Sequence, residues 1–254
     1  MPKLESRLTM AGTCSKYWIF LLILFTACTA PVGKERFSPE IWVGSNRTLV
    51  VMLPTMGGDG SSYESQGFIQ ELRDRGFTSH CKVLDVDPSL YLNRRIVDLL
   101  KSEVIEPAKA DGYEKIWLLG ISLGGHGALL YLSEYPEDIY ATAVLAPFVA
   151  DPLTTRLIQK EGGLKEMKKC PDLAWGYACN MLTLIKKYLG TPGNERRLAL
   201  GFGTDDAFAR QNRMLAELIA PDQIFIVQGG RHDWNTWKKL FDQVLDYIEK
   251  NRIG

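Results

Sequence analysis

Residues 116–127 read Ile-Trp-Leu-Leu-Gly-Ile-Ser-Leu-Gly-Gly-His-Gly, an apolar run that ends in a G-x-S-x-G sequence. The run Ile116–Leu119 has the length of a buried strand, and Ala128–Ser133 continues beyond the glycines with a helical pattern. A sharp turn between a strand and a helix leaves room only for very small residues two positions before and after its central serine. The pattern therefore predicts that Ser122 is a nucleophile on a strained turn, and the alternative is a glycine-rich packing turn.

Further apolar runs of strand length lie on both sides of this stretch, at Leu49–Leu53, Val83–Val86, Ala143–Phe148, Leu198–Phe202 and Ile224–Val227. Segments with a helical period and charged faces separate most of them, among them Ser65–Arg75, Arg94–Ala110 and Asn235–Lys250. Continuous apolar strands are buried on both faces, and their alternation with helices favours a parallel sheet. We therefore predict an α/β fold with a doubly wound, mostly parallel sheet of about six strands.

The connection between Asp151 and Arg197 is too long for a simple crossover and contains a helical pattern of its own. It is predicted to be a short helical cap insertion, at about residues 151–196, over the carboxyl edge of the sheet, where open α/β sheets bind ligands. The predicted domain runs from 47 to 254. Thirty basic side chains balance thirty acidic ones, so bulk charge gives no reason to expect nucleic acid as a partner.

A serine nucleophile needs a base within hydrogen-bond reach, and the sequence contains three histidines. His80 precedes the second apolar run, at the surface or at the opposite edge of the sheet. His126 lies on the first turn of the helix after Ser122, where access to the serine hydroxyl is awkward, so a neutral packing or supporting role is expected. His232 follows the last strand, at the carboxyl end of the sheet, and is therefore predicted to be the general base.

The acid that orients the base should follow an earlier strand. Asp205 and Asp206 end the penultimate strand, and either carboxylate could orient the imidazole while the other caps the next helix. Asp206 is the predicted acid, with Asp205 as the alternative. Asp151, after the preceding strand, is a third and weaker candidate.

Two backbone N–H groups are candidates for an oxyanion hole. Leu123 begins the helix after the nucleophile, and the loop 54–60 after the first strand is rich in glycine. Met56 is the predicted donor from that loop, with Thr55 as the alternative. Glycine-rich loops also bind phosphate, but the G-K-[ST] sequence of nucleotide sites is missing, and no Cys/His spacing suggests a metal. No cofactor or metal is therefore predicted.

The N-terminal segment has the pattern of an export signal. Lys3, Arg7 and Lys16 precede an uncharged run of eleven residues, Tyr17–Ala27. As a helix, this run would span about 16 Å, well short of the roughly 30 Å of a bilayer core. A positive region, a short apolar core and small residues before a cleavage point are typical of a secretory signal peptide. Residues 1–27 are therefore predicted to be a signal peptide.

The sequence Phe25-Thr26-Ala27-Cys28 at its end resembles the lipobox of bacterial lipoproteins. The resemblance implies that Cys28 is acylated and tethers the mature protein to the periplasmic face of a membrane of the bacterial cell envelope. Residues 28–46 would then be a linker or N-terminal segment before the domain. An ordinary cleaved signal, an uncleaved anchor and a misread core segment remain as alternatives.

Export changes how the other cysteines are interpreted. Cys14 would be removed with the signal peptide, and Cys81 is expected to be a core residue. Cys170 and Cys179 are nine positions apart, so they could form a disulfide in an oxidising compartment. The equal alternative is a pair of buried thiols.

From about Leu49 onward the chain resembles the α/β-hydrolase superfamily, in particular its small bacterial esterase-like members. The likeness rests on Leu-Pro-x-x-Gly-Gly at 53–58, Gly-Ile-Ser-Leu-Gly-Gly at 120–125, Gly-Thr-Asp-Asp at 203–206 and Gly-Arg-His-Asp-Trp at 230–234. It implies a serine hydrolase of the carboxylesterase type, with Ser122 as nucleophile, His232 as base and Asp206 as acid. One departure is Pro54-Thr55, where the family commonly has His-Gly, which leaves the identity of the loop donor open.

Specificity is expected to come from the insertion. Its apolar side chains could line an acyl pocket, or they could simply be its core: Leu173, Trp175, Tyr177, Met181 and Leu182. The expected substrate is a small acyl ester or a lipid-like molecule. Rival interpretations are a thioesterase, a peptidase, a lipid acyl hydrolase or acyltransferase on the same scaffold, and a non-catalytic binding lipoprotein.

Overall fold

The computed structural model describes residues 37–251 except 43, 59 and 172–175. The predicted signal peptide and the acylation site at Cys28 lie outside the described residues, as do Leu173 and Trp175 of the predicted pocket. Among the described helices, none is long and apolar enough to cross a bilayer.

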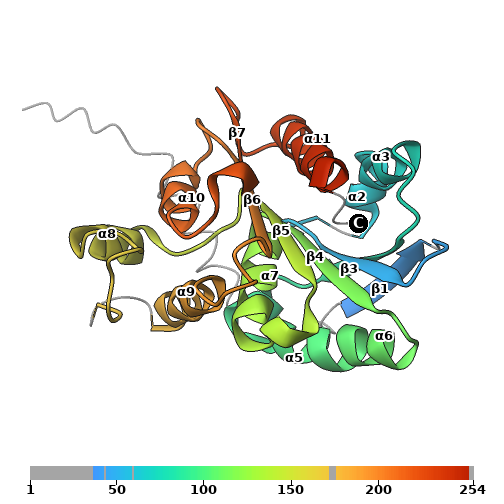
Figure 1. The fold of residues 1–254 in the computed structure, drawn as a ribbon, viewed down its shortest axis with the longest axis horizontal. Helices are drawn as coiled ribbons and strands as arrows, with labels where there is room; N and C mark the ends of the chain where they lie inside the picture. The colour runs from blue at the N-terminus through green and yellow to red at the C-terminus, as the bar shows by residue number, and fades with distance from the viewer. Residues whose placement is uncertain (1–36, 43, 59, 172–175, 252–254) are drawn as a thin grey trace, which may run out of the picture. The chain divides into compact units, whose positions relative to one another are not determined.

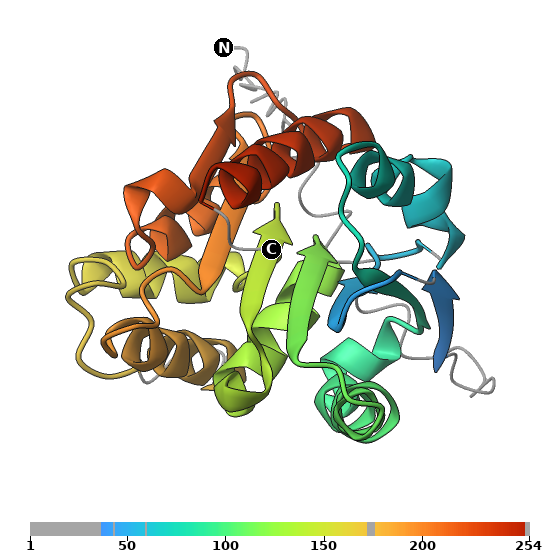
Figure 2. The ribbon, with the colours of Figure 1, turned by 45° about the vertical axis from the view of Figure 1, so that its right-hand side comes forward.

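The centre of the fold is one twisted sheet with helices on both faces (Figure 1, Figure 2). Its strands are β1 (Phe37–Trp42), β2 (Thr48–Leu53), β3 (His80–Val86), β4 (Lys115–Ile121), β5 (Ala141–Leu145), β6 (Leu198–Gly203) and β7 (Ile224–Val227). They pair in the order β1-β3-β2-β4-β5-β6-β7, and β2 to β7 are parallel. The predicted α/β class and the six parallel strands are confirmed.

The strand β1 lies within the segment 28–46, which we expected to be a linker. It pairs antiparallel with β3, with Phe37 opposite Val86, and so forms an edge of the sheet. Its sequence, Phe-Ser-Pro-Glu-Ile-Trp, is not a continuous apolar run, and Pro39 is tolerated because an edge strand need not donate every N–H. For these reasons the sequence pattern did not reveal it.

The strand β5 ends three residues earlier than predicted, at Leu145 rather than at Phe148. Ala146 has a φ of 46° and turns the chain out of the sheet, while its N–H donates to the carbonyl of Gly201. The turn carries Phe148 across to the end of β4. Because the segment 146–150 is apolar and buried apart from the half-buried Phe148, it read as a continuation of the strand.

Two apolar clusters fill the spaces between the sheet and its helices. One face is covered by α2 (Ser61–Ser65), α3 (Phe68–Asp74) and α11 (Trp234–Asn251). The other cluster includes α4 (Ser89–Leu92), α5 (Arg95–Leu99), the π-helical η2 (Leu100–Ile105), α6 (Glu106–Ala110), α7 (Leu123–Glu134) and α10 (Ala209–Ala216). Short 3₁₀ turns, η3 (Pro136–Asp138) and η4 (Pro221–Gln223), precede β5 and β7.

The predicted insertion contains two helices, α8 (Pro152–Lys160) and α9 (Gly176–Leu189). We expected the insertion over the carboxyl edge, but α9 packs beside α7 on one face of the sheet (Figure 1). The reason is its apolar side, because Cys179, Met181 and Leu182 are buried in the same cluster as the interior of α7. The other helix, α8, packs against α10.

The strand order places the ends of β2 and β4 next to each other. From β2 the chain crosses to β3 on one side, and it then returns to β4 on the other side of β2. The carboxyl ends of two strands at such a reversal leave a crevice between their loops, which is where open α/β sheets bind ligands. The glycine-rich loop after β2 and Ser122 after β4 both begin at this point.

Candidate active site

The predicted nucleophile occupies a strained turn. Ser122 lies between β4 and α7 with φ 56° and ψ −114°, a conformation that non-glycine residues rarely adopt. A Cβ on Gly120 would lie 2.4 Å from the carbonyl oxygen of Gly124, and one on Gly124 would lie 2.1 Å from the carbonyl oxygen of Leu53. Both contacts are with backbone, so neither glycine of the motif can be replaced without moving the chain.

Backbone hydrogen bonds hold the turn in place. The N–H of Ser122 donates to the carbonyl of Leu145, 3.0 Å away. The carbonyl of Ser122 accepts from the N–H of His126 at 3.1 Å and from the N–H of Phe148 at 3.0 Å. The strained conformation is thus fixed by β5, by the first turn of α7 and by the segment that follows β5.

Three of the predicted site residues form one chain of hydrogen bonds. Nε2 of His232 lies 2.8 Å from Oγ of Ser122, and Nδ1 lies 2.8 Å from Oδ2 of Asp206. A carboxylate can only accept, so we assign the proton of the neutral ring to Nδ1. Nε2 then carries the lone pair and can accept the hydroxyl proton of Ser122. This is the geometry that a general base requires.

The two adjacent aspartates differ in position. The side chain of Asp206 has no exposed surface, and its second oxygen, Oδ1, accepts from the N–H of Phe208 at 2.7 Å. Asp205 is exposed to solvent. The third candidate, Asp151, caps α8 by accepting from the N–H groups of Leu153 and Thr154. Of the three carboxylates, the structure brings that of Asp206 to His232.

Close contact between two loops brings the acid and the base together. A Cβ on Gly203, at the end of β6, would lie 2.2 Å from the carbonyl oxygen of Gly230, which follows β7. That oxygen accepts from the N–H of Asp205 at 2.9 Å. The preceding Gly229 has a φ of 68°, which favours glycine. The glycines noted in the sequence on both loops therefore allow this approach.

Of the two predicted oxyanion donors, Leu123 directly follows the nucleophile in the chain, and Met56 belongs to the loop after β2, the strand that pairs with β4. Leu123 is the first residue of α7, where N–H groups have no partner within the helix. Thr55 begins a turn in which its carbonyl accepts from Gly58 at 3.0 Å, and Met56 is the next residue. In the described part of the chain, no backbone acceptor takes the N–H of Met56 or Leu123. Both groups remain available to a developing oxyanion.

The other two histidines lie away from the hydroxyl of Ser122. His80 is the first residue of β3, at the opposite edge of the parallel strands, and its ring contacts Tyr113. His126 is buried, and burial lowers its pKa to about 4, so its ring is neutral at pH 7. Its Nδ1 lies 3.0 Å from the carbonyl oxygen of Phe148.

Aromatic rings that the sequence did not single out surround the base. Phe208 and Trp237 contact the ring of His232 edge to face, with centroids 4.8 and 5.0 Å away. Phe148 contacts Phe208 at 5.5 Å. Phe148 and Phe208 are half-buried, so they can contact a bound substrate. The sequence gives only a weak signal for Phe148 and Phe208, because each is simply an apolar residue after the end of a strand.

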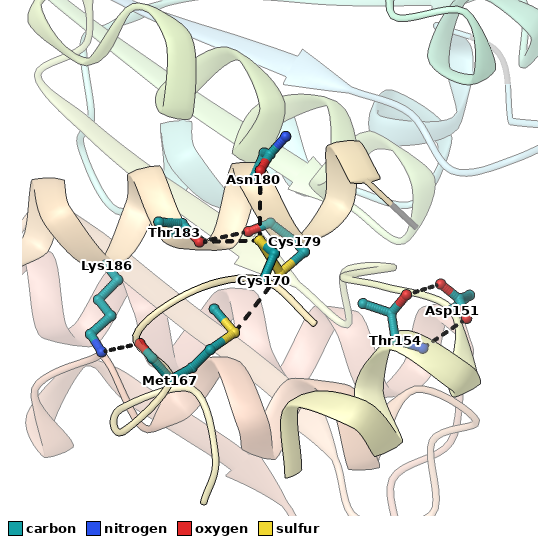
Figure 3. The surroundings of a disulfide bond; sticks show 8 residues. All are labelled: Asp151, Thr154, Met167, Cys170, Cys179, Asn180, Thr183 and Lys186. Carbon is teal, nitrogen blue, oxygen red and sulfur yellow. Dashed lines mark hydrogen bonds between the residues drawn. A yellow bond between two sulfur atoms is a disulfide. The ribbon is translucent and has the colours of Figure 1, made fainter. Parts of the chain in front are cut away.

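The predicted acyl-pocket residues have different surroundings. Tyr177 on α9 is half-buried, and its ring contacts that of His126. Met181 is 2% exposed and belongs to the core cluster. Cys170 and Cys179 are joined by a disulfide, which ties the segment before α9 to its first turn (Figure 3). Met167 packs against this bond, and Lys186 donates to the Met167 carbonyl.

An apolar cavity of about 70 Å³ lies elsewhere, between the sheet and the helices α3 and α11. It is lined by Phe77, Trp117 and Phe241 among others, and it does not include Ser122. Among the described residues, no group of three or more His, Cys, Asp or Glu side chains could hold a metal ion.

Comparison with known proteins finds a matching family model and a curated relative. The model of a family described as "Putative esterase" matches residues 46–248. An acetyl esterase of Caldicellulosiruptor saccharolyticus is 21% identical over 177 residues, which are 63% of this chain and 63% of the length of that relative. The chain thus spans somewhat less than two thirds of the curated relative that it matches.

Solved structures share the fold. An α/β hydrolase enzyme, MGS-MChE2, from the metagenome of lagoon sediments at Mar Chica, Morocco, matches with a TM-score of 0.56 and 18% identity, over 88% of this chain and 98% of the other. A structure from a study of carboxylesterases of the thaumarchaeon Nitrososphaera gargenis has a TM-score of 0.55 and 15% identity, over 87% and 97%. These likenesses show that the fold is that of the α/β hydrolases.

Proposed function

Because this chain belongs to the esterase family whose model it matches, we propose that it is a serine hydrolase that cleaves carboxylic esters through an acyl-enzyme. The observation that carries the proposal is the hydrogen-bonded chain from Ser122 through His232 to Asp206. The strained turn at Ser122 and the N–H groups of Met56 and Leu123, which no backbone acceptor among the described residues takes, support the same chemistry.

In the proposed reaction, Oγ of Ser122 attacks the ester carbonyl carbon while Nε2 of His232 takes the hydroxyl proton. The N–H groups of Met56 and Leu123 donate to the oxyanion that forms. The carbon–oxygen bond to the alcohol then breaks, and His232 returns the proton to the leaving alcohol. Water attacks the acyl-enzyme in the second half and gives a proton to His232. The bond between Oγ of Ser122 and the acyl carbon then breaks, His232 returns the proton to Oγ, and the carboxylic acid leaves.

Asp206 supports both halves of this reaction. Its carboxylate holds Nδ1–H of His232, so the ring cannot turn away from Ser122. When the ring gains a proton, the buried negative charge stabilises the imidazolium more strongly than a solvated charge would.

The substrate class follows from the surroundings of the base. The rings of Phe148 and Phe208 offer apolar surface but no charge, which suits a small uncharged acyl ester. The similarity to an acetyl esterase favours a short acyl group. Thioesters, peptides and lipid esters are the competing substrates on the same scaffold.

A substrate panel tests the proposal. We expect the full chain to hydrolyse p-nitrophenyl acetate faster than the corresponding decanoate, an acyl thioester or a peptide p-nitroanilide. The Ser122→Ala variant should lose the activity. Preference for thioester or peptide would reassign the substrate, and activity that survives Ser122→Ala would refute the nucleophile.

We further propose that the protein is exported and tethered to a membrane of the cell envelope through an acylated Cys28. The sequence of residues 1–27, which has the pattern of a signal peptide, supports this proposal. The disulfide between Cys170 and Cys179 supports it as well, because disulfides persist in oxidising compartments. Cys28→Ser should shift the protein from the membrane fraction to the soluble fraction of a bacterial host. An unchanged membrane fraction would contradict acylation at Cys28.

A further inference from the structure

We propose that His126 is a positioning residue for this reaction, because its Nδ1–H holds the carbonyl of Phe148 and thereby fixes the backbone that carries Ser122. The inference rests on the proposed function, since positioning has meaning only relative to the attacking serine. His126 is 2% exposed and lies four residues beyond Ser122 on α7, so it cannot contact a substrate.

The three residues form a closed ring of hydrogen bonds. The N–H of His126 donates to the carbonyl of Ser122, and the N–H of Phe148 donates to that same oxygen. The side chain of His126 closes the ring, with Nδ1 3.0 Å from the carbonyl oxygen of Phe148. Phe148 is therefore held at both its N–H and its carbonyl, and each bond leads back to the residue that bears the nucleophile.

The protonation state of the ring follows from its partners. A carbonyl oxygen only accepts, so Nδ1 carries the proton and Nε2 carries the lone pair. Nε2 is buried and has no hydrogen-bond partner among the described residues. Filling a core with a ring that leaves one nitrogen unpaired is unfavourable, and buried polar atoms in native proteins are usually paired. The bond made by Nδ1–H is the property that distinguishes this imidazole from an apolar ring.

The hydrogen bond from His126 to the Phe148 carbonyl also orients the aromatic residues beside His232. The ring of Phe148 contacts the ring of Phe208, and Phe208 contacts the ring of His232. The N–H of Phe208 in turn donates to Asp206. A change in the position of Phe148 would thus reach the nucleophile through the backbone and the base through two aromatic contacts.

Paired variants separate a positioning role from a packing role. His126→Phe keeps a ring in the core but removes the donor, whereas His126→Asn keeps a short N–H donor that can reach the Phe148 carbonyl. Leu129→Ala serves as the matched control, because Leu129 is buried on the same helix and its side chain forms none of the hydrogen bonds of this ring. If His126→Phe fails to fold, His126→Met is the second donor-free variant, since methionine adapts to irregular space.

The readouts are kcat and KM for p-nitrophenyl acetate and the midpoint of thermal unfolding, Tm, all measured on the full chain. We expect His126→Phe to lower kcat by about 10- to 100-fold with little change in KM, since small displacements of a reacting group have effects of this size. His126→Asn should stay within about threefold of the wild-type kcat, as expected when the donor is retained. Leu129→Ala should lower Tm without lowering kcat.

Either of two results would overturn the proposal: an unchanged kcat in the donor-free variants, or an equal loss in His126→Asn and His126→Phe. These two results can be told apart from failure of the proposed function itself. If the protein is not a serine hydrolase, the wild type will have no more activity than Ser122→Ala.

Discussion

Asp206 and Asp205 are neighbours in the chain but have different surroundings. The Asp206 side chain has no exposed surface, and each of its oxygens accepts a hydrogen bond, one from His232 and one from Phe208. A buried carboxylate is stable only when it is paired in this way. Asp205 is exposed, and its charge is weakened by water and salt.

A pair of isosteric substitutions tests this difference. Asp206→Asn should lower kcat for ester hydrolysis by about 10⁴-fold, because the amide favours the wrong tautomer of His232. Asp205→Asn has the same change of charge and should leave kcat within about twofold, as is usual for exposed positions. Steady-state kinetics on both variants measure the two effects. A larger loss of kcat in Asp205→Asn than in Asp206→Asn would show that Asp205, and not Asp206, is the acid.

The buried ring of His126 predicts a pH dependence of stability. Burial lowers its pKa from 6.5 to about 4, so the unfolded chain binds this proton more readily than the folded chain. The free energy of unfolding should therefore fall by about 1 kcal/mol per pH unit as the pH drops from 6.5 to 4, and level off below. Urea unfolding at several pH values measures it. His126→Met should lack this part of the slope, and an identical slope in both proteins would contradict the assignment.

At the scale of single residues, chemistry explains what the sequence revealed. His232 was predictable because only three histidines exist and the others lie away from the carboxyl ends of the strands. The sequence did not decide between Asp205 and Asp206, because the two residues are adjacent and lie at nearly the same distance beyond the end of the strand. The bond from His126 to Phe148 joins residues 22 positions apart, and no periodicity predicts it.

Among the structural elements, the turn after β4 depends on backbone contact rather than on side chains. Gly124 allows α7 to approach the carbonyls of Leu53 and Pro54. Gly60, by contrast, has only ordinary contacts beyond 3.5 Å and a negative φ of −57°. These two glycines form a natural comparison.

Gly124→Ala should lower the free energy of unfolding by about 3 kcal/mol, because a methyl group cannot fit against rigid backbone. Gly60→Ala should leave stability unchanged or raise it by about 0.5 kcal/mol through the unfolded state. Chemical denaturation of both variants measures the difference. Equal stability would show that the close approach in the turn is not required.

The disulfide stabilises the segment that leads into α9. Cys170→Ser should lower the free energy of unfolding by about 2 to 3 kcal/mol, the size expected for closing a short loop. A reductant should lower the wild-type Tm by a similar amount and leave that of Cys170→Ser unchanged. A wild-type Tm that does not respond to reductant would mean that the bond does not form in solution.

Elements were predictable where their pattern was unambiguous. The continuous apolar runs predicted all six parallel strands. The edge strand β1 was not predicted, because its sequence mixes polar and apolar residues. The end of β5 was misplaced because the buried turn after Leu145 is as apolar as the strand itself. An apolar sequence pattern indicates that a segment is buried, and in this protein the buried segment continues beyond the end of β5.

At the scale of the whole molecule, the site is a consequence of strand order. Ser122, Asp206 and His232 follow β4, β6 and β7, and the candidate oxyanion loop follows β2. Parallel strands deliver all four segments to the same edge of the sheet. The alternation of apolar runs and helices predicted this arrangement, but it could not reveal that α9 would pack on a face instead of over that edge.

The central claim is that Ser122 is a nucleophile activated by its neighbours. The most direct test is to treat the full chain with a fluorophosphonate, followed by mass spectrometry of the protein and its peptides. The account predicts one phosphonyl group per molecule, attached to Ser122, with none on Ser122→Ala and much slower attachment to Asp206→Asn. A wild-type protein that remains unlabelled, or one labelled at another residue, would contradict it.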